Sequence, residues 1–147
     1  MTPIATIGYE DATTAGFLEA LRGAGVELLV DVRAVANSRK PGFSKNRLAA
    51  SLGEAGIEYL HLRALGTPAE GRAAARAGDH AELRRVFTEH METPEAQAEL
   101  ETLAGLVRAG RRVCLMCLEA DPAHCHRTMV AAALAEQVPI EVNDLFP

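Results

Sequence analysis

The chain has 147 residues and a formal net charge of -5, with 48% hydrophobic and 24% charged residues. This length is typical of one domain with its own core, and the composition argues against a disordered, collagen-like or coiled-coil chain. The sequence shows no signal-peptide pattern, no long apolar run and too few cysteines for a disulfide framework, so we expect a single cytoplasmic domain (residues 1–147) that does not bind membranes.

Apolar runs rich in β-branched residues alternate with helical patterns, beginning with a predicted strand over residues 4–9. Thr14 is a suitable N-cap for the helix that follows, and Gly25 is suited to end it. A second strand is expected over residues 26–33, and Ser44 can cap the next helix. This alternation predicts parallel strands connected by helices.

The third strand is expected over residues 57–62. Residues 66–78 are polar and rich in Ala, Gly and Arg, which indicates a loop with one short helix and makes this segment a candidate lid. Asp79 and Thr93 then mark the starts of two helices. The fourth strand follows at residues 112–119.

The last predicted helix begins at Asp121 and runs to about Gln137. Pro139 confines the fifth strand, residues 138–142, to an edge of the sheet because proline cannot donate a backbone hydrogen bond. The whole pattern predicts an α/β fold class: a single-domain three-layer α/β/α fold with a mostly parallel sheet of about five strands.

In such a sheet, ligands bind at the carboxyl ends of the strands. Those ends carry polar or reactive residues in four groups: Gly8-Tyr9-Glu10, Asp31-Val32-Arg33, Leu65-Gly66-Thr67 and Cys117-Leu118-Glu119. Residues 31–63 also hold six basic residues against three acidic ones, and Arg makes bidentate contacts with phosphates and carboxylates. We therefore expect Arg33, Arg39 and Arg127 to converge with Tyr9 on one anion-binding cleft.

The cysteines fall into two groups. Cys114 and Cys117 lie three residues apart in one strand, so they face opposite sides of the sheet, and Cys114 is expected to be an inert core residue. The apolar stripe of the last helix turns Cys125 and His126 towards the sheet, which places Cys125 beside Cys117. The helix N-terminus and the adjacent His and Arg favour a thiolate at Cys125. The alternative is that Cys125 only packs and His126 only completes hydrogen bonds.

Thiolate and imidazole groups suit zinc or iron, so Cys117, Cys125 and His126, with His124 as a further candidate, are a conceivable metal site. Their spacing lacks the short paired intervals of structural zinc sites. We therefore expect no metal and no other cofactor.

Eight blocks of the sequence follow a common pattern: Thr6 to Tyr9, Leu29 to Arg33, Asn37 to Arg39, Phe43-Ser44, Gly56 to Tyr59, Leu65-Gly66, Leu115 to Glu119 and Cys125 to Arg127. Together they resemble the bacterial and archaeal domain-of-unknown-function 488 (DUF488) family over nearly the whole chain. The resemblance implies a small α/β domain without an assigned reaction. It also marks ten motif residues: Tyr9, Asp31, Arg33, Ser38, Arg39, Cys117, Glu119, Cys125, His126 and Arg127. Residues 34–36 lack the proline that is frequent in the family's version of this loop.

The order of a strand ending in Asp31-Val32-Arg33 and a later strand ending in Cys117 is also similar to the rhodanese domain. That similarity would make Cys117 a sulfur carrier. A rhodanese follows its cysteine with a glycine- and arginine-rich loop that cradles an anion, whereas Glu119 and Asp121 stand here and would repel an anionic sulfur donor.

The preferred hypothesis is an enzyme acting on a phosphate-bearing or other anionic substrate, such as a nucleotide or nucleic acid. The residues expected to bind this substrate are Tyr9, Asp31, Arg33, Ser38, Arg39 and Arg127. Glu119 and His126 would transfer protons, and Cys117 or Cys125 would be the nucleophile or a positioning thiol.

Three alternatives remain at the sequence level: rhodanese-like sulfur transfer, a nucleic-acid-binding module without chemistry, and a thiol or metal sensor. The chain has no Trp, four Phe and two Tyr, which disfavours a module that stacks bases on aromatic side chains. Any affinity for nucleic acid is expected to be weak and to fall steeply with salt, since few phosphates can be neutralised.

Overall fold

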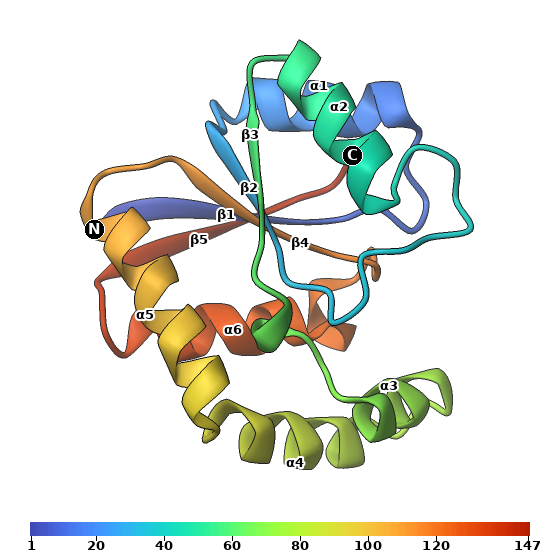
Figure 1. Ribbon diagram of the computed structural model, residues 1–147, viewed down its shortest axis with the longest axis vertical. Coiled ribbons are helices and arrows are strands. Elements are labelled where there is room, and N and C mark those ends of the chain that lie inside the picture. Colours follow the sequence, from blue (N-terminus) through green and yellow to red (C-terminus); the bar gives the residue numbers. More distant parts are fainter.

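The computed structural model describes the backbone of residues 1–147 and every side chain except that of His124. Five strands form one sheet in the order β3-β2-β4-β1-β5, and every neighbouring pair is parallel. The strands are β1 (Thr2–Gly8), β2 (Leu28–Asp31), β3 (Glu58–His61), β4 (Val113–Cys117) and β5 (Ile140–Leu145). The predicted α/β class is confirmed, and the strand after Pro139 lies at an edge as expected (Figure 1).

Helices cover both faces of the sheet, which gives three layers (Figure 1). They are α1 (Thr14–Gly23), α2 (Lys45–Glu54), α3 (Ala69–Arg76), α4 (His80–Met91), α5 (Pro94–Arg108) and α6 (His126–Ala135), with the 3-10 helices η1 (Arg63–Leu65) and η2 (Pro122–His124). α1 and α2 lie on one face, whereas α4, α5 and α6 lie on the other. No described helix has the length and apolar character needed to cross a lipid bilayer.

The alternation of side chains along β4 explains how one strand supports two cores. Leu115 and Cys117 belong to the hydrophobic cluster under α5 and α6, whereas Cys114 and Met116 belong to the cluster under α1 and α2. Because successive strand residues point to opposite faces, a strand buried on both sides is apolar throughout. The prediction that Cys114 faces away from Cys117 is confirmed.

The start of α6 differs from the sequence prediction. Asp121 begins only the short helix η2, where its carboxylate accepts a hydrogen bond from the backbone N–H of Ala123 at 2.9 Å. Cys125 then has extended backbone angles, φ -123 and ψ 140, and is the N-cap of α6. The predicted continuous helix from Asp121 was wrong, because this extended residue separates the two turns. Cys125 therefore lies at the joint between η2 and α6 and not in the first helical turn.

The segment predicted as a loop with one short helix contains α3, which packs against α4. The chain that leads into α3 passes close to the backbone of the connection after β2. A Cβ atom on Gly66 would lie only 2.1 Å from the backbone N of Ala34, so this position requires glycine. The contact holds the connection after β2 against the chain that leads into α3, and both segments border the pocket described below.

Candidate functional site

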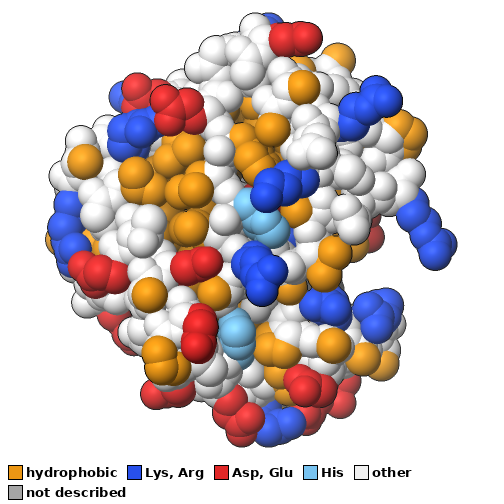
Figure 2. All heavy atoms as spheres, viewed as in Figure 1, with side chains coloured by type: hydrophobic (Ala, Val, Ile, Leu, Met, Phe, Trp, Pro, Cys, Tyr) orange, Lys and Arg blue, Asp and Glu red, His pale blue; other side chains and the backbone are white. Residues whose placement is uncertain are grey.

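A pocket of about 460 Å³ opens at the carboxyl ends of β1, β2 and β4 and is bordered by α3. Figure 2 shows a hollow at the right of the molecule, with Lys or Arg side chains above and below it. The residues that line the pocket are Tyr9, Glu10, Arg33, Ala34, Val35, Asn37, Thr67, Arg72, Ala75, Arg76, Leu83, Cys117, Leu118, Glu119 and His126. The predicted location at this edge of the sheet is thus where the structure forms a cavity.

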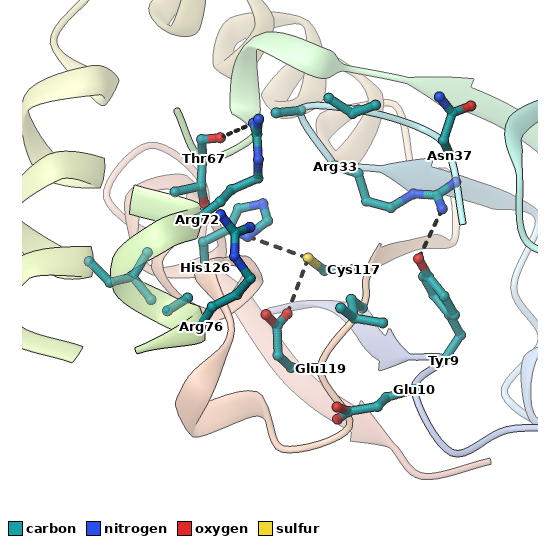
Figure 3. A pocket seen from close by; sticks show the side chains of 15 residues that line it. Tyr9, Glu10, Arg33, Asn37, Thr67, Arg72, Arg76, Cys117, Glu119 and His126 are labelled. Carbon is teal, nitrogen blue, oxygen red and sulfur yellow. Dashed lines mark hydrogen bonds between the residues drawn. The ribbon is translucent and has the colours of Figure 1, made fainter. Parts of the chain in front are cut away.

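Cys117 and His126 meet at the floor of this pocket (Figure 3). Cys117 Sγ lies 3.4 Å from His126 Nδ1 and 3.6 Å from Glu119 Oε2. His126 Nε2 lies 2.6 Å from the carbonyl oxygen of Val32, which can only accept a hydrogen bond. Nε2 therefore carries the proton of the neutral ring, and Nδ1 presents its lone pair to the sulfur.

Cys125 completes this group from the joint before α6. Its sulfur, Cys117 Sγ and one ring nitrogen of His126 all lie within 4.8 Å of one another. The three residues are buried, with exposed fractions of 5% for Cys117, 4% for Cys125 and 6% for His126. The prediction that Cys117 and Cys125 are neighbours in space is confirmed.

Burial and neighbouring groups shift the pKa values of Cys125 and His126. Burial raises the pKa of the Cys125 thiol well above its usual value, and the neighbouring sulfur of Cys117 raises it further. Burial therefore opposes the thiolate that the helix N-terminus was expected to favour at Cys125. Burial tends to lower the pKa of His126, but its contacts with Cys125 and with the carbonyl of Val32 outweigh that effect and raise it.

We expect Cys114 to be the last of the three cysteines to react when the folded protein is treated with iodoacetamide in the presence of a chelator. Cys114 is completely buried, and burial raises its pKa, whereas Cys117 lines the pocket. Peptide mass spectrometry at successive times gives the order of modification. Alkylation of Cys114 as fast as that of Cys117 would contradict the assignment of Cys114 to the core.

Arg33 lines the other side of the pocket, but its guanidinium is already committed to neighbours. It pairs with Asp31 at 2.7 Å and donates to the Tyr9 hydroxyl at 3.1 Å and to the Phe43 carbonyl at 2.8 Å. Tyr59 donates a further hydrogen bond to Asp31 Oδ2 at 2.6 Å. Although burial acts to lower it, the contact with Asp31 raises the pKa of Arg33. This buried network positions the pocket wall and leaves little capacity for an anion.

The predicted convergence of Arg33, Arg39 and Arg127 was wrong. Arg39 is exposed, Arg127 is fully buried, and neither is among the described residues that line the pocket. The Arg127 guanidinium donates to the backbone carbonyls of Glu119 and Ala120, so it pins the connection after β4. Arg127 binds these carbonyls because a connection without regular secondary structure leaves backbone oxygens that need hydrogen-bond donors.

Ser38, another predicted contact residue, also lies outside the described pocket lining. Its hydroxyl accepts from the backbone N–H of Lys40 at 3.1 Å, and its carbonyl accepts from the Ser44 hydroxyl at 3.2 Å. These bonds shape the loop between β2 and α2, so Ser38 supports the wall of the site without facing the pocket.

The structure brings two other arginines to the pocket that the sequence analysis missed. Arg72 and Arg76 lie four residues apart on α3, on one helical face, and Figure 3 shows both beside Cys117 and Glu119, across the pocket from Arg33 and Tyr9. Arg72 Nη1 donates to the Thr67 carbonyl at 3.0 Å, whereas no described acidic side chain pairs with Arg76. Their spacing of four residues was the available signal, in a segment for which the sequence predicts a loop with only one weak helix.

Comparison with curated proteins and with solved structures gave no match to this chain. The family described as "Domain of unknown function DUF488" matches residues 13–134, a range that includes α3, Cys117 and the Cys125-His126 pair but not Tyr9. The predicted resemblance is confirmed: this chain belongs to the DUF488 family.

Proposed function

We propose that this protein is an enzyme that acts on a small phosphate-bearing or otherwise anionic substrate, such as a nucleotide, in the pocket bordered by α3. One observation carries the proposal: two arginines line the same cavity as a buried thiol and imidazole and a half-buried carboxylate. A binding module needs the arginines but has no use for a thiol and an imidazole held 3.4 Å apart beside them.

Arg72 and Arg76 would hold the anionic group. A guanidinium makes charge-assisted, often bidentate hydrogen bonds with phosphate or carboxylate oxygens. Arg76 is exposed and unpaired among the described side chains, so it can reach a ligand without breaking an existing ion pair. The substrate would then extend from α3 towards the floor of the pocket.

The reaction would take place at Cys117 and His126, with Glu119 as the proton donor or acceptor. Glu119 is half-buried and lies 3.6 Å from Cys117 Sγ, within reach of a bound substrate. The thiol and imidazole can serve either as a nucleophile with its base or as ligands of a metal. Hydrolysis or group transfer at the anionic substrate is compatible with both.

The test is binding of inorganic phosphate and of adenosine monophosphate, measured by isothermal titration calorimetry. The Arg76→Ala variant should bind the phosphate group about 10- to 100-fold more weakly. This factor corresponds to the loss of a hydrogen bond to a charged group, which contributes about 1.5–3 kcal/mol. Arg84→Ala removes the same charge from α4 outside the pocket, and Arg39→Ala removes the arginine that the sequence favoured. Both control variants should bind like the wild type.

Equal weakening in Arg76→Ala and Arg84→Ala would mean that the effect is one of net charge only. If Arg39→Ala weakens binding and Arg76→Ala does not, the anion lies outside this pocket. Either result would overturn the proposal. A substrate screen with a panel of nucleotides and phosphate esters, read as product formation by the wild type and by Glu119→Gln, then identifies the reaction.

Sulfur transfer through Cys117 remains a second candidate because Cys117 ends β4 and reaches the pocket. The Glu119 carboxylate beside the sulfur disfavours it, since a sulfane-sulfur donor such as thiosulfate is anionic. Attack of the Cys117 thiolate on the sulfane sulfur would break the S–S bond of thiosulfate, release sulfite and leave a persulfide on Cys117. Detection of that persulfide in the intact mass after incubation with thiosulfate would favour this candidate. A base-stacking module is disfavoured further, since Tyr9 is only 2% exposed and stacks on Phe43 at 4.7 Å between ring centroids.

A further inference from the structure

We propose that Cys117, Cys125 and His126 bind one zinc ion, or another divalent cation that prefers sulfur and nitrogen ligands, at the floor of the pocket. This inference rests on the proposed function, because it assigns a chemical role to the thiol and imidazole groups that lie in the same pocket as Arg72 and Arg76. It departs from the expectation of no metal, which considered only the spacing along the chain.

The ligand atoms are at nearly the right separations. Tetrahedral zinc, with Zn–S bonds of about 2.3 Å and Zn–N bonds of about 2.0–2.1 Å, holds its ligand atoms about 3.5–3.8 Å apart. Cys117 Sγ and His126 Nδ1 are 3.4 Å apart, and all three ligand atoms lie within 4.8 Å of one another. A contraction of about 1 Å on the longest side would form the three-ligand face of a tetrahedron.

His126 is oriented as a metal ligand would be. In metal sites, a ligating histidine almost always donates its second ring N–H to a carbonyl or carboxylate, which fixes the tautomer and the ring orientation. His126 Nε2 lies 2.6 Å from the Val32 carbonyl, and the ring packs against Phe87 with centroids 5.4 Å apart. The lone pair of Nδ1 therefore faces the two sulfur atoms.

A cation also explains two features that a simple nucleophile and base leave unexplained. A cysteine nucleophile needs one thiol, yet Cys125 lies buried beside Cys117 in the same cluster. The carboxylate of Glu119 stands 3.6 Å from Cys117 Sγ and would repel a free thiolate. A divalent charge compensates both sulfurs and makes the neighbouring carboxylate favourable.

Among the side chains that the structure describes, only these three form the group, and this leaves a fourth ligand position open towards the substrate. Cys117 and His126 line the pocket, whereas Cys125 is not among its described lining residues and supports the ion from behind. Three protein ligands with one open position are typical of catalytic zinc, where a water or a substrate oxygen completes the tetrahedron. Glu119 is placed to accept a proton from such a water.

The experiment is elemental analysis of freshly purified protein without a metal-affinity tag, followed by titration of the chelator-treated protein with Co²⁺. We expect close to one equivalent of zinc per chain, and cobalt spectra with thiolate charge-transfer and tetrahedral d–d bands. Loss of an outer-shell partner of a metal ligand lowers metal affinity by about 10- to 100-fold. Cys125→Ser removes a ligand itself, so it should lower the affinity for the metal by more than that. The matched control is Cys114→Ser, which removes a buried thiol on the opposite face and should retain the ion.

If Cys125→Ser does not fold, the wild type still decides the question. The chelator should then make Cys117 and Cys125 accessible to alkylation, and Zn²⁺ should restore their protection. The inference would be overturned by metal-free wild type that binds Co²⁺ no better than Cys125→Ser, or by a Cys117–Cys125 disulfide in the intact mass of the fresh protein.

The two proposals fail in different ways. Metal-free protein that still loses phosphate affinity in Arg76→Ala keeps the anionic substrate and excludes the ion. Protein that holds one zinc but binds phosphate equally well in the wild type and in Arg76→Ala keeps the ion and excludes the proposed anion site.

Discussion

Replacing Asp31→Asn should lower the free energy of unfolding by about 3–5 kcal/mol, because it leaves the buried guanidinium of Arg33 without its counter-charge. Asp31 is fully buried and accepts hydrogen bonds from the backbone and side chain of Arg33 and from Tyr59. An amide cannot accept all of them with the same geometry, and one of its groups is a donor. Urea unfolding followed by circular dichroism measures the change.

Glu82→Gln is the matched control for this loss of charge. Glu82 pairs with Arg85 on α4, but the two side chains are 39% and 56% exposed, so water replaces the lost interaction. Its unfolding midpoint should stay close to that of the wild type. Equal shifts in Asp31→Asn and Glu82→Gln would show that the buried network is not what stabilises this side of the pocket.

The second large effect is expected for Gly8→Ala. Gly8 ends β1 opposite Cys117, and a Cβ atom there would lie 1.8 Å from the carbonyl oxygen of Glu119. That carbonyl is held by Arg127, so the clash moves backbone and cannot be relieved by a side-chain rotation. We expect a loss of stability near the upper end of about 1–3 kcal/mol, measured by urea unfolding.

Gly105→Ala provides a control of opposite sign. Gly105 lies inside α5, and a Cβ atom there would meet no other atom within 4 Å. Alanine in a helix interior is more stable than glycine by about 0.5–1 kcal/mol, so this variant should unfold at a higher urea concentration than the wild type. Unchanged stability in Gly8→Ala would contradict the close packing of β1 against the connection after β4.

Several features of the fold could be predicted from local sequence patterns alone. The alternation of apolar runs with helical periods indicated the parallel sheet, and it also placed Cys114 on the opposite face from Cys117. Asp79 and Thr93 cap α4 and α5 as predicted, since a cap depends only on residues within one turn. The cap of α1 is Thr13 and not Thr14, a one-residue difference that a local pattern does not resolve.

The role of each arginine could not be predicted in this way. The motif residue Arg127 looked suited to a phosphate, yet it binds the backbone oxygens of Glu119 and Ala120. Arg72 lay in a segment without a strong pattern, yet the packing of α3 against α4 brings it over the pocket. A long cationic side chain binds whichever hydrogen-bond acceptor lies within its reach. The tertiary structure determines which acceptor that is.

The sequence by itself thus determined the order and type of the strands and helices, the edge of the sheet that carries the pocket, and which cysteine lies on the opposite face of the sheet from the other two. These features follow from the two periods of side-chain direction and from parallel strands ending at one edge. The sequence also placed Cys125 beside Cys117, but only the tertiary structure decided that the two sulfur atoms and a ring nitrogen of His126 lie within 4.8 Å of one another. Their meeting depends on the extended backbone of Cys125 and on the Val32 carbonyl that turns the imidazole, and both are set by contacts between segments far apart in the chain.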